Sequence, residues 1–127
     1  YTDVPGLPAA IPALVNDLDL EVIAPNGDLY RGNAFADGES VAATFHGDRI
    51  NNVEGVHLSE PAAGEWTVRV RGVNVVQDVH RRTTGAPEQD FALVISGQLA
   101  GSGCGRTSVT SFPQNDIEKK YIDRPWS

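Results

Sequence analysis

Polar and apolar residues alternate most clearly in two segments of the chain, residues 17–24 and 65–71. Successive side chains of a β-strand point to opposite faces, so this period of two predicts two half-buried strands. The predicted core face combines apolar residues of both segments: Leu18, Leu20, Val22, Trp66, Val68 and Val70. The acidic residues of the first segment are expected on the opposite, solvated face: Asp17, Asp19 and Glu21.

Turn residues separate these segments from further short strands. Residues 25–28 read Pro-Asn-Gly-Asp, in which Pro fixes φ and Asn-Gly accepts positive φ, so the chain is expected to reverse there. Residues 29–31 then pair back as the second strand of a hairpin. Shorter strands are expected around residues 41–45, 52–58, 73–79 and 91–96.

Many short strands without a helical period or an internal repeat predict an all-β fold, namely an antiparallel β-sandwich or jelly roll. The 127 residues are enough for one hydrophobic core. We assign residues 1–97 to this domain. Residues 98–127 begin with a glycine-rich run and are expected to form a linker and an irregular C-terminal tail.

The net charge of −7 disfavours nucleic acid and anionic membranes as partners and favours cations. No apolar run approaches the roughly 18 residues that a membrane span requires. Cys104 is the single cysteine, so no internal disulfide is possible and the residue is assigned no role.

The sequence displays no catalytic machinery. It lacks a Gly-x-Ser-x-Gly elbow, and His46, His57 and His80 stand in no triad context. Phosphate-binding glycine turns and zinc-ligand spacings are also missing. We therefore predict that this chain is not itself an enzyme.

Oxygen ligands are the chemistry that remains. Asp17 and Asp19, which follow Asn16, share one face of a strand about 7 Å apart. A second polar group consists of Asp48, Asn51, Asn52 and Glu54. Calcium takes about six to eight oxygen ligands, so two such groups can close one site. The alternative is that the acidic residues only keep the outer face of an edge strand exposed to solvent and deter pairing with another strand.

Several segments together carry a family resemblance. They are residues 1–6 (Tyr-Thr-Asp-Val-Pro-Gly), 13–20 (Ala-Leu-Val-Asn-Asp-Leu-Asp-Leu), 61–68 (Pro-Ala-Ala-Gly-Glu-Trp-Thr-Val) and 89–94 (Gln-Asp-Phe-Ala-Leu-Val). Over residues 1–97 the chain resembles the β-sandwich that follows the catalytic domain in many secreted subtilisin-like serine proteases. That sandwich is similar to the P domain of kexin-like proteases, a jelly roll that stabilises the catalytic unit.

The resemblance implies a secreted, non-catalytic accessory domain, and calcium as its cofactor, because some of these domains bind calcium. It supports Asp17 and Asp19 directly as ligands. Asp48, Asn52 and Glu54 follow as ligands from a second loop, and Asn33 as a further candidate.

The family's sandwich has strands before the segment that matches residues 1–6. The implied partner is therefore the protease catalytic domain or another chain that supplies these first strands by strand addition. The alternative function is a binding or adhesion module that joins a multi-chain assembly by strand addition or by docking of its tail. Aromatic residues of the tail are the candidate anchors, unless the tail folds onto its own domain: Phe112, Tyr121 and Trp126.

Overall fold

The computed structural model describes residues 1–11, 13–42, 46–79, 86–98 and, for the backbone alone, 117–122. Five strands form within these ranges: β1 (Asp17–Ile23), β2 (Leu29–Ala36), β3 (Glu39–Ala42), β4 (Glu65–Asn74) and β5 (Ile117–Ile122). The predicted all-β class is confirmed. Over the same ranges, no helix has the length and apolar character needed to cross a membrane.

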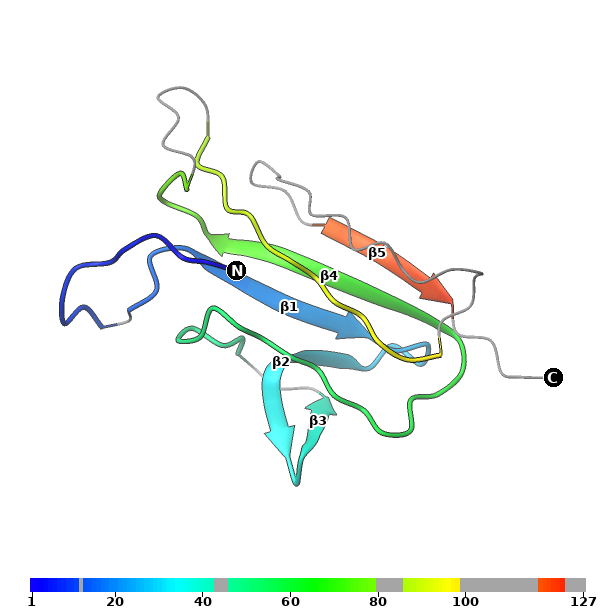
Figure 1. Ribbon diagram of the computed structural model, residues 1–127. Coiled ribbons are helices and arrows are strands. Elements are labelled where there is room, and N and C mark those ends of the chain that lie inside the picture. Colours follow the sequence, from blue (N-terminus) through cyan, green and yellow to red (C-terminus); the bar gives the residue numbers. More distant parts are fainter. Residues whose placement is uncertain (12, 43–45, 80–85, 99–116, 123–127) are drawn as a thin grey trace.

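All five strands belong to one antiparallel sheet in the order β3-β2-β1-β4-β5. Figure 1 shows β1 in the middle of this sheet, between β2 and the long strand β4. The second sheet of the predicted sandwich does not occur within the described ranges. Because β1 is the central strand, the side chains on its two faces are the ones that the sheet can bury most completely.

The turn after β1 has the predicted structure. The Gly27 N–H donates to the Ala24 carbonyl at 2.9 Å, and Gly27 has a φ of 92°. The next hairpin was missed, because only residues 29–31 were expected to pair back and no turn was predicted at residues 37 and 38. Asp37 and Gly38 both have positive φ there, the geometry that makes Asp-Gly a two-residue hairpin turn. The strand expected around residues 41–45 therefore begins earlier, as β3.

Two predicted strands are irregular in the structure, residues 52–58 and 91–96, and of the strand expected at 73–79 only Val73 and Asn74 are strand, as the end of β4. The first of them exchanges isolated hydrogen bonds with neighbouring strands instead of a ladder. The Asn33 N–H donates to the Gly55 carbonyl at 2.9 Å, and the Ser40 N–H donates to the His57 carbonyl at 2.8 Å. Gly55 interrupts the period of two, which explains why the alternation there overstated the regularity.

The prediction of an irregular tail is wrong for residues 117–122. These residues form β5, which pairs with β4 from Val70↔Ile117 to Glu65↔Ile122. Their sequence, Ile-Glu-Lys-Lys-Tyr-Ile, lacks a clean period of two. The pairing instead satisfies the backbone groups on the outer edge of β4, which no local pattern announces. Of the predicted tail features, Cys104, Phe112 and Trp126 lie outside the described residues.

The apolar face of β1 packs as the alternation predicted. Leu18 and Val68 are buried at 7% exposure each, and Val22 lies opposite Val68 on β4 and Tyr30 on β2. The rings of Tyr30 and Trp66 lie next to each other, with 6.2 Å between their centroids. This face forms the apolar core of the described sheet.

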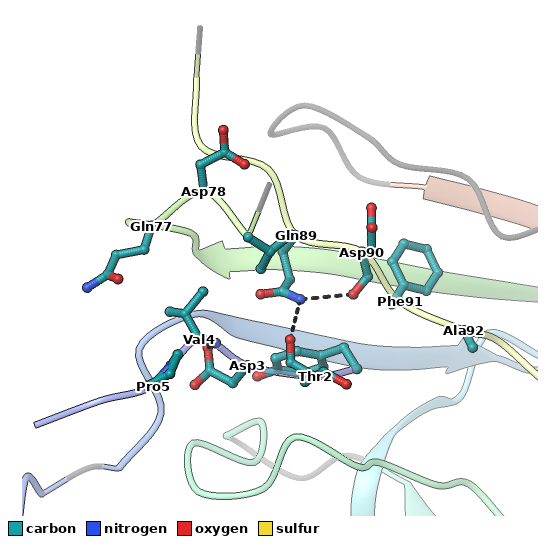
Figure 2. A pocket seen from close by; sticks show the side chains of 12 residues that line it. Thr2, Asp3, Val4, Pro5, Gln77, Asp78, Gln89, Asp90, Phe91 and Ala92 are labelled. Carbon is teal, nitrogen blue, oxygen red and sulfur yellow. Dashed lines mark hydrogen bonds between the residues drawn. The ribbon is translucent and has the colours of Figure 1, made fainter. Parts of the chain in front are cut away.

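A network of side-chain hydrogen bonds centred on Asn16 and Gln89 holds the start of β1. Asn16 is fully buried, and its side-chain amide donates to the Gln77 carbonyl at 2.7 Å and to Gln89 Oε1 at 2.8 Å. Gln89 in turn donates to the carbonyls of Thr2 and Asp90, at 2.9 Å each. Figure 2 shows the two bonds that Gln89 donates, in a pocket between the N-terminal segment and the residues after β4. This network links four segments that are distant in the sequence, next to Asp17, the first acidic residue of β1.

Candidate functional site: a carboxylate cluster on β1

The acidic face of β1 is buried, contrary to the sequence-based expectation of a solvated face. Asp17, Asp19 and Glu21 are 8%, 3% and 2% exposed, which makes them as buried as Leu18 on the opposite face. A buried carboxylate is costly unless a cation or hydrogen-bond donors compensate it. The compensating groups come from β2, β4 and the loop of residues 46–58.

Glu21 is compensated by arginines of both neighbouring strands. Arg31 on β2 and Arg69 on β4 lie opposite Glu21 in the register. The distance from Glu21 Oε1 to Arg31 Nη1 is 2.6 Å, and Glu21 Oε2 lies 3.5 Å from Arg69 Nη1. Arg71 adds a third guanidinium 3.4 Å from Oε1. Cross-strand placement of opposite charges therefore explains how the sheet buries this carboxylate.

Asp17 and Asp19 share the guanidinium of Arg49, which comes from the loop of residues 46–58. Arg49 Nη1 lies 3.0 Å from Asp17 Oδ2 and makes a very short contact with Asp19 Oδ1. Glycine at position 47 permits this approach, since an added Cβ would lie 2.5 Å from both Asp19 carboxylate oxygens. Arg49 remains 46% exposed, so a half-exposed cation caps two buried anions.

Glu54 contacts β1 at the point where the pairing between β1 and β2 ends. The β1–β2 register ends at Glu21↔Arg31, and the next free donor, the Leu20 N–H, donates to Glu54 Oε2 at 2.7 Å. An added Cβ at Gly32 would clash with the Glu54 side chain. Glycine at that position therefore makes room for the carboxylate against the strand.

Burial and neighbouring charge shift the protonation of this group. Burial raises the pKa of Glu54 to about 7, and the charges of Asp19, Asp48 and Asp17 add to the effect. Burial also raises the pKa of Asp17, although Arg49 opposes the change. Both pKa values rise because Asp17 and Glu54 are removed from water beside other carboxylates.

The Asp48 carboxylate is held by donors from β2 and from its own loop. Its carboxylate accepts hydrogen bonds from the Asn33 side chain at 2.6 Å and the Asn51 side chain at 2.7 Å, and from two backbone N–H groups. Partial burial opposes ionisation, but these donors outweigh it and lower the pKa of Asp48 to about 2. Asn33 also accepts from the Gly55 N–H at 3.0 Å. Both side chains therefore shape the loop.

Asn52 faces the N-terminus of the chain. Its side-chain amide donates to the Tyr1 carbonyl at 2.9 Å, and the Tyr1 amino group donates to the Asn52 carbonyl at 2.9 Å. Of the six residues named as calcium ligands, the structure brings four carboxylates near one another: Asp17, Asp19, Asp48 and Glu54. Asp48 and the two asparagines, Asn33 and Asn52, are occupied with structural hydrogen bonds.

The cluster was tested for its fit to a metal ion. Two of its buried oxygens have no hydrogen-bond partner, Asp17 Oδ1 and Glu54 Oε1. Such oxygens are the hard ligands that calcium takes. Within the described part of the chain, however, no three Asp, Glu, His or Cys side chains are arranged to hold an ion. The donor chemistry suits calcium, but the arrangement of these side chains does not.

Sequence reasoning missed the cationic half of this site. The polar residues of 65–71 include Arg69 and Arg71 at the same spacing as the acidic residues of 17–24. Placing the two strands side by side would have paired these opposite charges. Nothing in the local sequence around Arg49 indicated that it would reach Asp17 and Asp19.

One comparison with known proteins found a relative. The chain is 31% identical over 98 residues to a Dictyostelium discoideum protein named serine protease/ABC transporter B family protein tagA. The match covers 75% of this chain and 5% of that protein. An all-β segment that corresponds to so small a share of a long protein is an accessory part rather than a catalytic unit. No protein-family model and no solved structure matches the chain.

Proposed function

We propose that this chain is a non-catalytic accessory domain of a larger secreted protein that contains a subtilisin-like serine protease, which the domain stabilises. The observation that carries the proposal is the similarity, over three quarters of the chain, to a protein named as a serine protease. The P-domain-like identity and the secreted location rest on the resemblance of residues 1–97 described above. The catalytic domain of the same protein is the proposed partner.

The physical route to stabilisation is the buried ionic face. A sheet that buries Asp17, Asp19 and Glu21 against arginines of three other segments ties those segments to one strand. Local opening would leave these charges unpaired at low dielectric, which is costly. A domain held in this way resists the local unfolding that exposes a protease to self-digestion.

The test uses the whole parent protein with Glu21→Gln and, as a matched control, the exposed Glu60→Gln. We expect Glu21→Gln to shorten the half-life of protease activity at elevated temperature several-fold while kcat/KM at low temperature stays unchanged. Glu60→Gln should behave as wild type. An unchanged half-life for Glu21→Gln, or hydrolysis of peptides by this chain alone, would overturn the proposal.

Calcium is the proposed cofactor of the domain. The unpartnered oxygens Asp17 Oδ1 and Glu54 Oε1 support it, because both are buried without a hydrogen-bond donor. Bound at Asp17, Asp19 and Glu54, the ion would neutralise negative charge that Arg49 leaves uncompensated. Calcium binding would then raise the melting temperature by mass action. No shift at millimolar calcium would refute the calcium part and leave the accessory role untouched.

The alternative function, a module that joins other chains by strand addition, has less support. The outer edge of β4 is already paired with β5 of the same chain. The other edge is β3, which has four residues, and a short edge strand deters pairing with a foreign strand. Deleting residues 101–127 and measuring the oligomeric mass tests this alternative, which predicts association once the β4 edge is open.

A further inference from the structure

The turn after β1 contains the one Asn-Gly pair of the sequence. Asn26 and Gly27 lie exposed between the end of β1 at Ile23 and the start of β2 at Leu29. Gly27 has no side chain to shield its backbone nitrogen, and a Cβ added there would meet nothing within 4 Å. Every other asparagine of the chain is followed by a residue with a side chain. The Gly27 nitrogen is therefore the least hindered backbone neighbour of any asparagine side chain in this protein.

These groups support one uncatalysed reaction, the deamidation of Asn26. The Gly27 nitrogen loses its proton to hydroxide and attacks Cγ of Asn26, which forms a new C–N bond and closes a five-membered succinimide ring. The Cγ–Nδ2 bond breaks, and Nδ2 leaves as ammonia after it takes a proton from water. Water then adds to one of the two ring carbonyls and opens the ring to aspartate or to isoaspartate. The net change is the hydrolysis of one amide by water, and nothing is oxidised or reduced.

The folded turn engages each group that takes part in this reaction. Asn26 Nδ2 donates to Asp28 Oδ2 at 2.8 Å, and Asn26 Oδ1 accepts from the Asp28 N–H at 3.0 Å. The Gly27 N–H, which must be lost, donates to the Ala24 carbonyl at 2.9 Å. Attack by the Gly27 nitrogen breaks its hydrogen bond to Ala24, and departure of Nδ2 breaks the bond to Asp28. Reaction in the folded chain therefore requires local opening of the turn.

The turn is also anchored at its start. The Ala24 N–H donates to the Asp28 carbonyl at 2.9 Å. Pro25 lies so close to Gly64 that a Cβ added at Gly64 would be 2.6 Å from Pro25 Cγ. These contacts keep the turn closed, although residues 25–28 are exposed to the water and hydroxide that the reaction uses.

The Asp28 side chain adds an electrostatic barrier to the same reaction. Negative charge develops first on the Gly27 nitrogen and then on Oδ1 of Asn26 during the attack. The Asp28 carboxylate, 2.8 Å from the Asn26 amide nitrogen, repels this charge, and solvent screening reduces the repulsion without removing it. The Asp28 N–H favours charge on Oδ1, but this donor belongs to the backbone and is independent of the side chain. The carboxylate is therefore the part of Asp28 that slows the reaction.

We propose that Asn26 is a site of spontaneous deamidation whose rate the Asp28 side chain sets. The product places a carboxylate where the Nδ2 donor faced Asp28, and isoaspartate also adds a carbon atom to the main chain. Both changes disturb the turn that aligns Ile23 with Leu29 and so fixes the register of β1 and β2. Ageing of the protein in water therefore loosens the hairpin at the end of its central strand. This inference goes beyond the accessory function and does not depend on it.

The test follows position 26 of the full chain during incubation in mildly alkaline buffer. Peptide mapping separates its asparagine, aspartate and isoaspartate forms. Wild type is compared with Asp28→Ala and with the matched control Glu60→Ala, because Glu60 is exposed and lines the same pocket as Asn26 but is not its hydrogen-bond partner. We expect Asp28→Ala to react about fivefold faster than wild type, since both the bond to Nδ2 and the repulsion are removed. Glu60→Ala should react at the wild-type rate.

The same incubation in concentrated urea separates the effect of the folded turn from that of the sequence. Wild type should react about tenfold faster in urea than when folded, because opening of the turn no longer limits the reaction. Asp28→Ala should then react within about twofold of wild type. Equal rates of folded wild type and folded Asp28→Ala would overturn the role of Asp28, as would an effect of this change that is equally large in urea. Absence of modification at position 26 in urea would overturn the site itself.

A second variant protects the test against misfolding. If Asp28→Ala shows no cooperative melting, Asp28→Asn replaces it, because asparagine keeps an acceptor for Nδ2 and removes only the charge. Its rate of deamidation at position 26 should exceed that of wild type by a smaller factor. A rate equal to or below that of wild type would overturn the inference.

A melting experiment checks the consequence for the hairpin. Wild type aged until half of position 26 has reacted should melt below fresh wild type. Asn26→Ser is the control, because serine has no amide to lose, and its aged and fresh samples should melt at the same temperature. An unchanged melting temperature of aged wild type would overturn the loosening of the hairpin.

Discussion

The acidic face of β1 is more completely buried than its apolar face, and different forces hold the two. Leu18 on one face and Asp19 on the other are 7% and 3% exposed. The apolar face packs against Val68 and its neighbours and gains from the removal of apolar surface from water. The acidic face is buried only because arginines reach it from both neighbouring strands and from a loop. Alternation of residue types therefore predicts which side chains share a face, but it does not predict whether a polar face is wet.

The largest expected effect comes from removing the centre of the ionic face. Glu21→Gln leaves Arg31, Arg69 and Arg71 around an uncharged side chain. Breaking one side of a buried ion pair is strongly destabilising, and we expect a loss of about 3 kcal/mol in the free energy of unfolding. Urea denaturation measures it. A loss below about 0.5 kcal/mol, the range of ordinary surface changes, would mean that the ionic face is as tolerant as a solvated one.

The matching change on the apolar face is Leu18→Ala. Leu18 is 7% exposed, and truncating a buried leucine costs the transfer free energy plus a cavity, here about 2 kcal/mol. Leu7→Ala is the control, because Leu7 is 82% exposed and should change stability little. If both variants unfold at the same urea concentration, the apolar face of β1 is not the core of the sheet.

A smaller effect is expected where the loop meets the acidic face. Gly47→Ala places a Cβ 2.5 Å from the Asp19 carboxylate oxygens and must push them away from Arg49. We expect a loss of about 1–2 kcal/mol, the range typical of overpacking. Gly55→Ala is the control, because its Cβ would meet nothing closer than 4.0 Å. Equal midpoints of thermal unfolding for the two variants would contradict the close approach at Gly47.

The smallest effect concerns pH, measured in chelator. The pKa of Glu54 rises on folding from 4.5 to about 7, so the folded state binds the proton more tightly. Its stabilising contribution is full below pH 4.5 and is lost as pH rises through 7. Solvent screening limits the effect to about 1 kcal/mol. Glu54→Gln should flatten the stability profile between pH 5 and 8, whereas the exposed Glu60→Gln should reproduce the wild-type slope.

Local patterns predicted the elements whose signals lie within a few residues. The alternation in 17–24 and 65–71 located β1 and β4, and the sequence Pro-Asn-Gly-Asp located the first turn. The pairing of β5 with β4 depends on backbone groups more than forty residues away in the chain, so its own sequence carried no sign of it. Medium- and long-range pairing is the part of this fold that a linear pattern cannot specify.

The candidate site shows the same division. Proximity of Asp17, Asp19 and Glu54 follows from the strand period and from one returning loop, and it was predicted. The use of Asp48 and Asn33 as loop-forming groups depends on how their hydrogen bonds are distributed, which residue type alone leaves open. Insertion of Arg49 depends on the three-dimensional path of the loop past Gly47.

The most direct test of the buried ionic face is a double-mutant cycle between Asp19 and Arg49, carried out in chelator. Unfolding free energies are measured for wild type, Asp19→Asn, Arg49→Gln and the double variant. If the guanidinium is the counter-ion of this carboxylate, the two changes are coupled by about 1–2 kcal/mol, and the double variant is more stable than the sum of the single effects predicts. Strict additivity of the two changes would contradict the account.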